Sequence, residues 1–374
     1  MEFALLQAVF LPLLLSPVAY IIGKKAGPNS ATWFTFGVLL YCTVLLVLAS
    51  LDGKYEEHYA WTELFGEFGF LLDELAIPFA IIIYVLCTIL VLYSKPYMVH
   101  KFKENFEHQH TQSAASAGGH TTAVVESAAL TSYVNSHSGL YFAMFLVFSM
   151  GMLGTVLATN LIEFYIFFEV MLIPSFFLIA FYGDGPKRRI ALMFFFWTHV
   201  GAVVLLLGFL TIGLTVGSFD FADIREADIP SDVVTLAAVA IIIGLGVKLA
   251  AFLFHIWLPY AHGAAPTPIS ALLSPAMIGI GAYGIFRLIV QILPMQYGEL
   301  AIWLHLWGVV TMIYGGTMAL MQDDIKRLFA YSSISQMGYI LFGIGSMSVL
   351  GLSGAEMMYV TNGLGKGQIG RAHV

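Results

Sequence analysis

Apolar runs about as long as a membrane is thick follow one another along almost the whole chain, and they constrain its fold more than any other feature. The chain is 59% hydrophobic and only 10% charged, whereas soluble domains are about 25% charged. Since about 20 apolar residues cross a bilayer as one helix, we expect an all-α, polytopic membrane helix bundle with about 10 or 11 spans. The expected spans are residues 3–22, 32–51, 75–95, 139–158, 161–182, 190–216, 233–257, 268–293, 300–321 and 329–350, with an eleventh beginning near Ser353.

The basic residues are distributed unevenly between the predicted loops. Those after odd-numbered spans contain Lys24, Lys25, Lys95, Lys101, Lys103, Lys187, Arg188, Arg189, Lys326 and Arg327. Those after even-numbered spans contain only Lys54, Arg225 and, near a helix end, Arg287. Because basic loops stay on the cytoplasmic side, we predict cytoplasmic odd-numbered loops and an N-terminus outside. The acidic loops 52–67 and 220–232 are then also outside.

Several other kinds of function receive no support from the sequence. No basic stretch indicates nucleic-acid binding. Cys42 and Cys87 lie singly in apolar runs, which is typical of small buried hydrophobic residues and not of a disulfide or an iron–sulfur site. Residues 100–138 are rich in His, Ser, Ala and Gly; a flexible solvated loop is favoured over a metal-binding tract, because no regular ligand spacing is present. We therefore expect no metal and no redox cofactor on this chain.

Glu169 and Lys248 are lone opposite charges in the middle of two predicted spans. A charged group in the bilayer core costs roughly 2.5–3.5 kcal/mol by insertion scales and usually has a function. Making and breaking a Glu–Lys pair would change the proton affinity of the lysine, which an arginine could not use. We predict that the two residues form a proton relay. A static salt bridge is the alternative, although buried pairs stabilise poorly once desolvation is counted.

A proline-rich segment from Phe254 to Pro275 separates the seventh and eighth predicted spans. Interrupted helices at membrane depth leave backbone groups that must face protein or water-filled cavities. His255 and His262 lie beside this break and are expected to pass protons, since imidazole titrates near neutral pH; satisfying free carbonyls is the alternative. His199 and His305 are further lone histidines, and their spacing does not require haem.

Two other motifs lie in or near the later spans. Gly279–Gly284 formally matches GxGxxG, but no strand precedes it, so close helix packing is favoured over dinucleotide binding. Ser332, Ser333, Ser335 and Gln336 cluster at the start of the tenth span. This cluster fits either a hydrated pocket or ordinary polarity at a helix start.

The last residues, 368–374, do not continue the eleventh span. Ile369 to Val374 resembles a translated sequencing adapter and places Arg371 and His373 where apolar residues are expected. We expect the natural sequence to diverge at about Gly367 and the chain to be a fragment. A natural polar C-terminus is the alternative.

Four of these segments together resemble the antiporter-like membrane subunits of respiratory complex I, and most closely subunit M with its archaeal relatives. They are Phe168–Pro174, Lys248, His255–Thr267 and Asp324–Gly338. The resemblance covers roughly residues 65–367.

The resemblance implies an architecture and a division of the chain. It implies about fourteen helices with inverted five-helix repeats and broken helices. The segments are then 1–138 (three helices and the His/Ser-rich loop), 139–293 (first proton-channel repeat), 294–367 (start of the second repeat) and 368–374 (a non-native tail).

The resemblance also implies an activity: proton translocation across a prokaryotic plasma membrane, driven by quinone reduction elsewhere in an NADH:quinone oxidoreductase-type complex. Glu169 takes the coupling role and Lys248 that of the central lysine, with Lys366, Ser332 and Gln336 as further relay residues. L-, N- and K-like subunits are the expected partners, and FMN and iron–sulfur clusters lie on other subunits.

This sequence departs from the family pattern at three positions. Gly279 stands where a helix-eight lysine or histidine is usual, Tyr260 replaces an aspartate, and Asn362 stands where a histidine is common. Three other functions stay open: a subunit of a multisubunit Na⁺/H⁺ antiporter, the membrane arm of a hydrogenase- or formate-linked complex, and a passive membrane anchor for redox partners.

Overall fold

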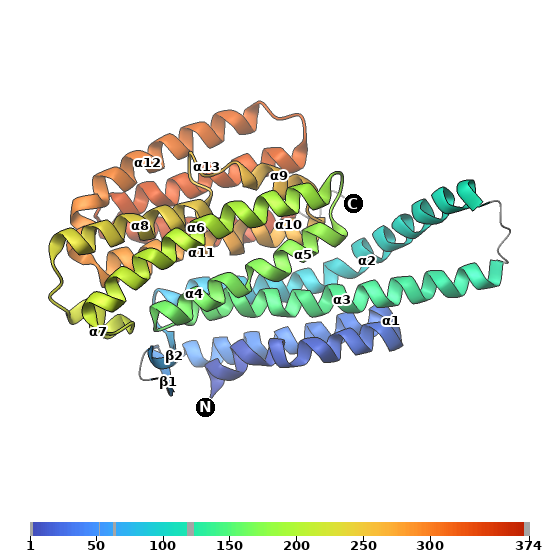
Figure 1. The fold of residues 1–374 in the computed structure, drawn as a ribbon, viewed down its shortest axis with the longest axis horizontal. Helices are drawn as coiled ribbons and strands as arrows, with labels where there is room; N and C mark the ends of the chain where they lie inside the picture. Colours follow the sequence, from blue (N-terminus) through green and yellow to red (C-terminus); the bar gives the residue numbers. More distant parts are fainter. Residues whose placement is uncertain (1–2, 52, 63–64, 118–122, 370–374) are drawn as a thin grey trace.

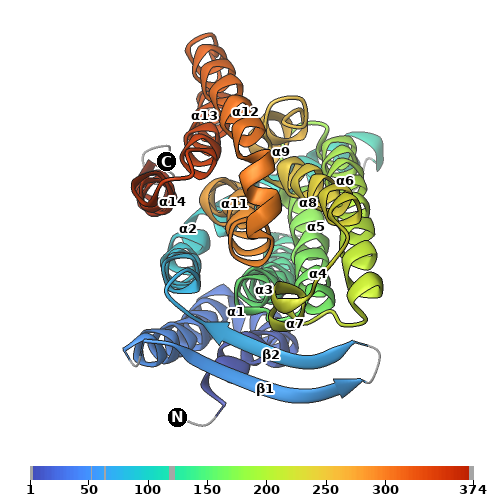
Figure 2. The same ribbon diagram turned by 90° about the vertical axis from the view of Figure 1, so that its left-hand side faces the viewer.

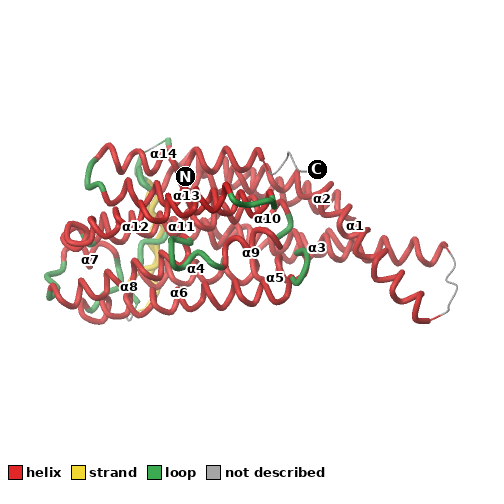
Figure 3. Tube along the Cα trace, turned by 90° about the horizontal axis from the view of Figure 1, so that it is seen from above, coloured by secondary structure: helices red, strands yellow, loops and turns green. Residues whose placement is uncertain are grey.

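The computed structural model describes residues 3–51, 53–62, 65–117 and 123–369. Long helices run side by side along one axis, and strand structure is confined to one short segment (Figure 1, Figure 3). The elements in chain order are α1 (Ala4–Ser50), β1 (Tyr55–Thr62), β2 (Gly66–Leu72), α2 (Ala76–Ala117), α3 (Ala123–Leu157), α4 (Leu161–Val170), α5 (Leu172–Tyr182), α6 (Lys187–Val216), α7 (Phe221–Glu226), α8 (Ser231–Leu249), α9 (Trp257–Ala264), α10 (Thr267–Leu272), the π-helix η1 (Leu273–Met277), α11 (Ile278–Gly284), the π-helix η2 (Ile285–Ile292), α12 (Pro294–Leu320), α13 (Ile325–Gly345) and α14 (Val349–Ile369).

The helical bundle confirms the predicted fold class. Within the described ranges, 8 helices are long and apolar enough to cross a membrane. The first, α1, contains both of the first two predicted spans, which part at Gly27, where a φ of 83° interrupts the helix. The helices α13 and α14 lie where the tenth and eleventh spans were expected, although they are not among those 8.

The eighth predicted span is the centre of the bundle. It is built from α10, η1, α11 and η2, and 94% of its most apolar window is buried. The corresponding share for α12 is only 28%, which places α12 at the periphery of the bundle. Both cysteines are free and buried, as the sequence predicted.

The prediction of a flexible solvated loop at residues 100–138 is wrong for the residues that the structure describes, because they are helical. The helix α2 continues to Ala117 and α3 begins at Ala123, so that the two spans extend well past the rest of the bundle (Figure 1). Alanine and other helix-compatible residues are frequent in this segment, and they let each span propagate although its polar side chains end the apolar run. The side chains of His110 and His120 lie outside the described residues.

A β-hairpin forms within the loop that was expected after the second span. Strands β1 and β2 pair antiparallel, with Tyr55 opposite Leu72 and Thr62 opposite Gly66. Figure 2, viewed from this end, shows the hairpin across the bundle with α7 close to β2. Side chains alternate between the two faces of a strand, and apolar residues of β2 such as Phe70 are buried. The hairpin therefore closes one end of the N-terminal helices.

The opposite end of the bundle carries a basic cluster. Lys101 Nζ donates to Asp184 Oδ1 at 2.5 Å, and Lys326 Nζ donates to Asp184 Oδ2 at 3.5 Å. These contacts join α2, the α5–α6 connection and the start of α13. The loops that were predicted to share one side of the membrane thus lie together in space.

Candidate functional site

The seventh span is broken. The helix α8 ends at Leu249, and α9 begins only at Trp257. Between them, Ala250 and Leu253 have φ angles of 56° and 81°, a left-handed conformation that costs free energy for residues with a Cβ. The sequence predicted a break at the prolines between spans seven and eight, and the structure has one there, at residues 265–266 between α9 and α10. The interruption at residues 250–256 is an additional break that lies before the prolines.

Indole groups donate to three backbone carbonyls at the break, one of which, that of Val247, also accepts from the Ala250 N–H at 3.2 Å. Trp257 donates to the carbonyl of Val247, Trp307 to that of Phe252 and Trp197 to that of Phe254, each at 2.9 Å. A buried carbonyl without a donor costs about 1–3 kcal/mol. Since Trp197 lies on α6 and Trp307 on α12, the interruption is stabilised by neighbouring helices as well as by its own sequence.

Lys248 lies in the last turn before this break. Its side chain is almost completely enclosed, with 2% of the residue exposed. The ammonium nitrogen lies 4.6 Å from the ring centroid of Phe168 on α4, a distance at which a cation is attracted to an aromatic face. The ring compensates only part of the hydration that the ammonium group loses on burial.

Glu169, the next residue after Phe168, pairs with a histidine. Its Oε2 lies 2.8 Å from His199 Nδ1 on α6, and its Oε1 is buried without a hydrogen-bond partner. No ion pair joins Glu169 to Lys248 in the described part of the chain. The structure thus gives Glu169 a different partner from the one that the sequence suggested.

His255 and His262 both lie at the broken helix, as predicted. His255 is in the break itself, and its Nε2 lies 2.9 Å from the Tyr314 hydroxyl. His262 lies in the last turn of α9, and its Nδ1 lies 2.7 Å from Ser270 Oγ on α10. Each ring therefore has a hydroxyl partner through which a proton can pass.

The predicted serine cluster lies close to the centre of the bundle. Ser333 and Ser274 share a hydrogen bond of 2.5 Å between their hydroxyl groups, which connects α13 to η1. Ser332 and Gln336 are half-buried, and Gln336 Oε1 is buried without a partner. Lys366 lies in α14, but its side chain is outside the described residues.

Gly279 contacts a tyrosine. A Cβ added to Gly279 would lie 2.1 Å from the ring of Tyr359, and that ring stacks on Phe79 with the centroids 4.1 Å apart. Tyr359 thus occupies the place next to Gly279 where a longer side chain would project. A Cβ on Gly281 would lie 2.8 Å from the Leu245 carbonyl oxygen, so this motif serves close helix packing, as predicted.

Several contacts of the predicted relay residues had little signal in the sequence. His199 was noticed only as a lone histidine, although an isolated histidine one span away from an isolated glutamate was a usable signal. Tyr314 carried no signal in a chain with 18 tyrosines. Arg287 was interpreted as a residue near a helix end, but it is buried and makes a bidentate pair with Asp73 at 2.6 and 2.7 Å.

The described residues contain no group of three or more His, Cys, Asp and Glu side chains that could hold a metal ion. What the site offers is titratable groups next to hydroxyls and a helix break. Together with the bundle, this defines a polytopic membrane protein with discontinuous helices around buried charges. The chain belongs to the family described as "NADH:quinone oxidoreductase/Mrp antiporter, TM", whose sequence profile matches residues 158–369.

Curated relatives agree with this membership. The chain is 34% identical over 234 residues to NAD(P)H-quinone oxidoreductase chain 4 3 of Picosynechococcus sp., a match that covers 62% of this chain and 42% of that protein. It is 36% identical over 226 residues to NADH-quinone oxidoreductase subunit M of Rickettsia bellii, covering 60% and 46%. The match therefore spans less than half of the length of these relatives.

Solved structures share the fold over nearly the whole chain. The Mrp complex from Dietzia sp. DQ12-45-1b matches with a TM-score of 0.79 and 24% identity, covering 98% of this chain and 37% of that one. The archaeal membrane-bound sulfane sulfur reductase (MBS) matches with a TM-score of 0.80 and 20% identity, covering 98% and 70%. At these identities the likeness concerns the fold alone.

Proposed function

We propose that this chain contains the first proton half-channel of an antiporter-like subunit in an NADH:quinone oxidoreductase-type complex. The observation that carries the proposal is Lys248, an enclosed lysine at the end of α8 that has no ion pair among the described residues. Its ammonium group lies against the ring of Phe168, the residue before Glu169. Family membership and the relatives named as quinone oxidoreductase subunits support the wider assignment.

The mechanism follows from the two possible partners of Glu169. While the carboxylate pairs with His199, the Lys248 ammonium group lies on the Phe168 ring and has no ion pair within the described part of the chain, so release of its proton is favoured. If the carboxylate turns to Lys248, the ammonium form is stabilised and a proton is taken up. His199 thereby acts as the positioning residue that holds Glu169 away from the lysine.

The released proton would move along the hydroxyl and imidazole groups at the break. The His262–Ser270 and Ser274–Ser333 pairs are two hydrogen-bonded contacts whose serines are four residues apart in the eighth span, and they would be successive steps of this route from α9 to α13. Ser332, Gln336 and Lys366 are the proposed continuation into the second repeat. His255 with Tyr314 forms a side branch at the break.

The wider setting belongs to the same proposal. The clustering of basic residues at one end and the acidic hairpin at the other supports a multi-pass protein with the hairpin and N-terminus outside a prokaryotic plasma membrane. L-, N- and K-like subunits would surround it, and FMN, iron–sulfur clusters and quinone would be bound on other subunits. This chain would carry no redox cofactor.

The test is proton pumping by the complete complex with Glu169→Gln or Lys248→Arg. Glu169→Gln should slow pumping by at least about tenfold, the lower end of what positioned acid–base groups contribute. Lys248→Arg should do the same, because an arginine keeps the charge but does not release the proton. The matched control is Glu226→Gln on the exposed surface of α7. Normal assembly with unchanged pumping in both variants would favour a passive anchor instead.

A second candidate function is Na⁺/H⁺ exchange. The family description includes Mrp antiporters, and the solved Mrp complex has the same fold. Exchange predicts that Na⁺ on one side of a liposome drives proton movement through the complete protein without an electron donor. Proton movement that requires electron transfer and does not depend on the Na⁺ gradient would support the first proposal.

A further inference from the structure

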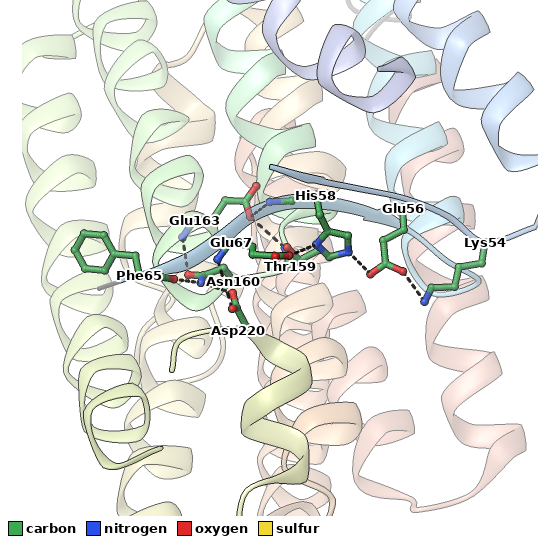
Figure 4. Close-up of polar contacts among 10 residues, drawn as sticks. Lys54, Glu56, His58, Phe65, Glu67, Thr159, Asn160, Glu163 and Asp220 are labelled. Carbon is green, nitrogen blue, oxygen red and sulfur yellow. Dashed lines mark hydrogen bonds and ion pairs between the residues drawn. The ribbon is translucent and has the colours of Figure 1, made fainter. Parts of the chain in front are cut away.

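A second buried carboxylate lies at the hairpin end of the bundle, outside the relay described above. Glu163 is in the first turn of α4, and none of its surface is exposed. Its position six residues before Glu169 places the two carboxylates about 9 Å apart along the helix axis. Figure 4 shows Glu163 beneath the hairpin, next to polar groups from three other parts of the chain.

The two oxygens of Glu163 have different surroundings. Oε2 accepts two long hydrogen bonds from the backbone, from Thr159 N at 3.3 Å and Gly69 N at 3.4 Å. Oε1 is buried without a hydrogen-bond partner. Helix capping alone does not account for this arrangement, because Asn160 already caps α4 through its own side chain. An ionised carboxylate here would be buried with one oxygen that accepts no hydrogen bond, which is costly in the protein interior.

Gly69 connects Glu163 to the hairpin surface. Its N–H faces Glu163, while a Cβ on it would lie 2.7 Å from Thr159 Oγ1 and 3.1 Å from His58 Nδ1. The hydroxyl, the imidazole nitrogen and the Glu57 carbonyl oxygen therefore all lie on the side of Gly69 where a side chain would otherwise project. His58 is 45% exposed on its side chain and contacts Glu56 through Nε2 and Glu67 through Nδ1.

The remaining charged group near Glu163 is Asp220, the residue before α7. It accepts from Asn160 Nδ2 at 2.7 Å, and the Glu67 N–H points to it at 3.5 Å. Burial raises the pKa of Asp220, and the charges of Asp223 and Glu67 add to this against the opposing hydrogen bonds. The negative charge of Asp220 also disfavours a second ionised carboxylate nearby.

We propose that Glu163 is a proton-binding group that exchanges protons with the hairpin-side solution through Thr159 and His58. A proton would leave Glu163, which becomes a carboxylate, and the Thr159 hydroxyl would accept it while giving its own proton to Nδ1 of the His58 imidazole. The ring then releases one proton from Nε2 towards Glu56 and the solution, so that the number of protons is conserved and nothing is oxidised or reduced. This inference rests on the proposed proton-translocating function and identifies the residues through which the proton path would open to the solution on the hairpin side.

Infrared difference spectroscopy tests the protonation of Glu163 without relying on pumping. The complete complex in liposomes should show a protonated-carboxyl carbonyl band near neutral pH that is absent in Glu163→Gln. The matched control is Glu57→Gln, because Glu57 lies in the same hairpin but accepts hydrogen bonds from Leu5 N, Leu6 N and the Tyr59 hydroxyl. A band lost equally in both variants, or no band at all, would overturn the proposal.

A flux measurement tests the exchange route and does not depend on Glu163→Gln folding. Proton uptake from the hairpin side, driven by an imposed membrane potential, should slow about tenfold in His58→Gln. Lys54→Gln removes only the neighbouring contact to Glu56 and should leave the uptake unchanged. Unchanged uptake in His58→Gln would refute the route. If the carboxyl band is present but Glu169→Gln pumps normally, the proposed function fails while Glu163 keeps its proton.

Discussion

Replacing Trp307 by phenylalanine tests whether neighbouring helices stabilise the break in the seventh span. The change removes the indole N–H that donates to the Phe252 carbonyl at 2.9 Å. That carbonyl then lacks this donor, which costs about 1–3 kcal/mol of stability. At about 2 cal/mol/K per residue, the 374 residues of the chain give an unfolding entropy of about 0.8 kcal/mol/K. We therefore expect Tm to fall by about 1–4 °C.

The matched control is Trp303→Phe, one turn earlier on the same helix. Trp303 is 67% exposed, so the same chemical change should leave Tm nearly unaltered. Both Tm values are measured by intrinsic-fluorescence thermal unfolding of the purified complete protein in detergent. Equal Tm values for the two variants would refute the argument that the α12 indole stabilises the interrupted backbone.

Two further predictions concern buried contacts away from the relay. Burial would raise the pKa of Asp73, but the hydrogen bonds and charge of Arg287 outweigh it and hold the pKa low; the pair therefore stabilises the fold at neutral pH and loses this contribution as the pH falls through the lowered pKa. In Arg287→Gln, Tm should be lower than that of the unchanged protein at pH 7, and the part of the fall in Tm at acidic pH that comes from this pair should disappear. A Tm–pH profile equal to that of the unchanged protein would contradict the pairing. Gly279→Ala should cost about 1–3 kcal/mol by overpacking, because its Cβ would lie 2.1 Å from the Tyr359 ring, whereas Gly354→Ala meets nothing within 4 Å. Equal thermal stability of these two alanine variants would show that Tyr359 moves away freely.

The helical spans could be predicted because hydropathy depends on many residues at once. A run of about 20 apolar side chains has few alternatives in a membrane, so small errors at single positions do not change the result. The β-hairpin was missed because its strands are short and lie in a segment with several acidic residues, where Glu56 and Glu67 were interpreted as loop charges.

The sequence identified the candidate relay residues, but it did not predict the groups that they contact. Glu169 and Lys248 stand out because charge is rare in apolar spans. Their actual neighbours, His199 and the ring of Phe168, depend on the rotation of helices that no local pattern specifies. The left-handed Ala250 was equally invisible, since alanine favours a helix and the tertiary contacts of the break override that preference.

The indole contacts at the break make Lys248 sensitive to mechanical displacement of its neighbours. Trp197 on α6 and Trp307 on α12 each hold one carbonyl of the short segment that follows the lysine. A tilt or slide of either helix would pull directly on this segment, and stretched hydrogen bonds weaken steeply with distance and angle. The position of the segment next to the buried ammonium group is therefore set by two helices that are far from the lysine in the sequence, through two tryptophan side chains.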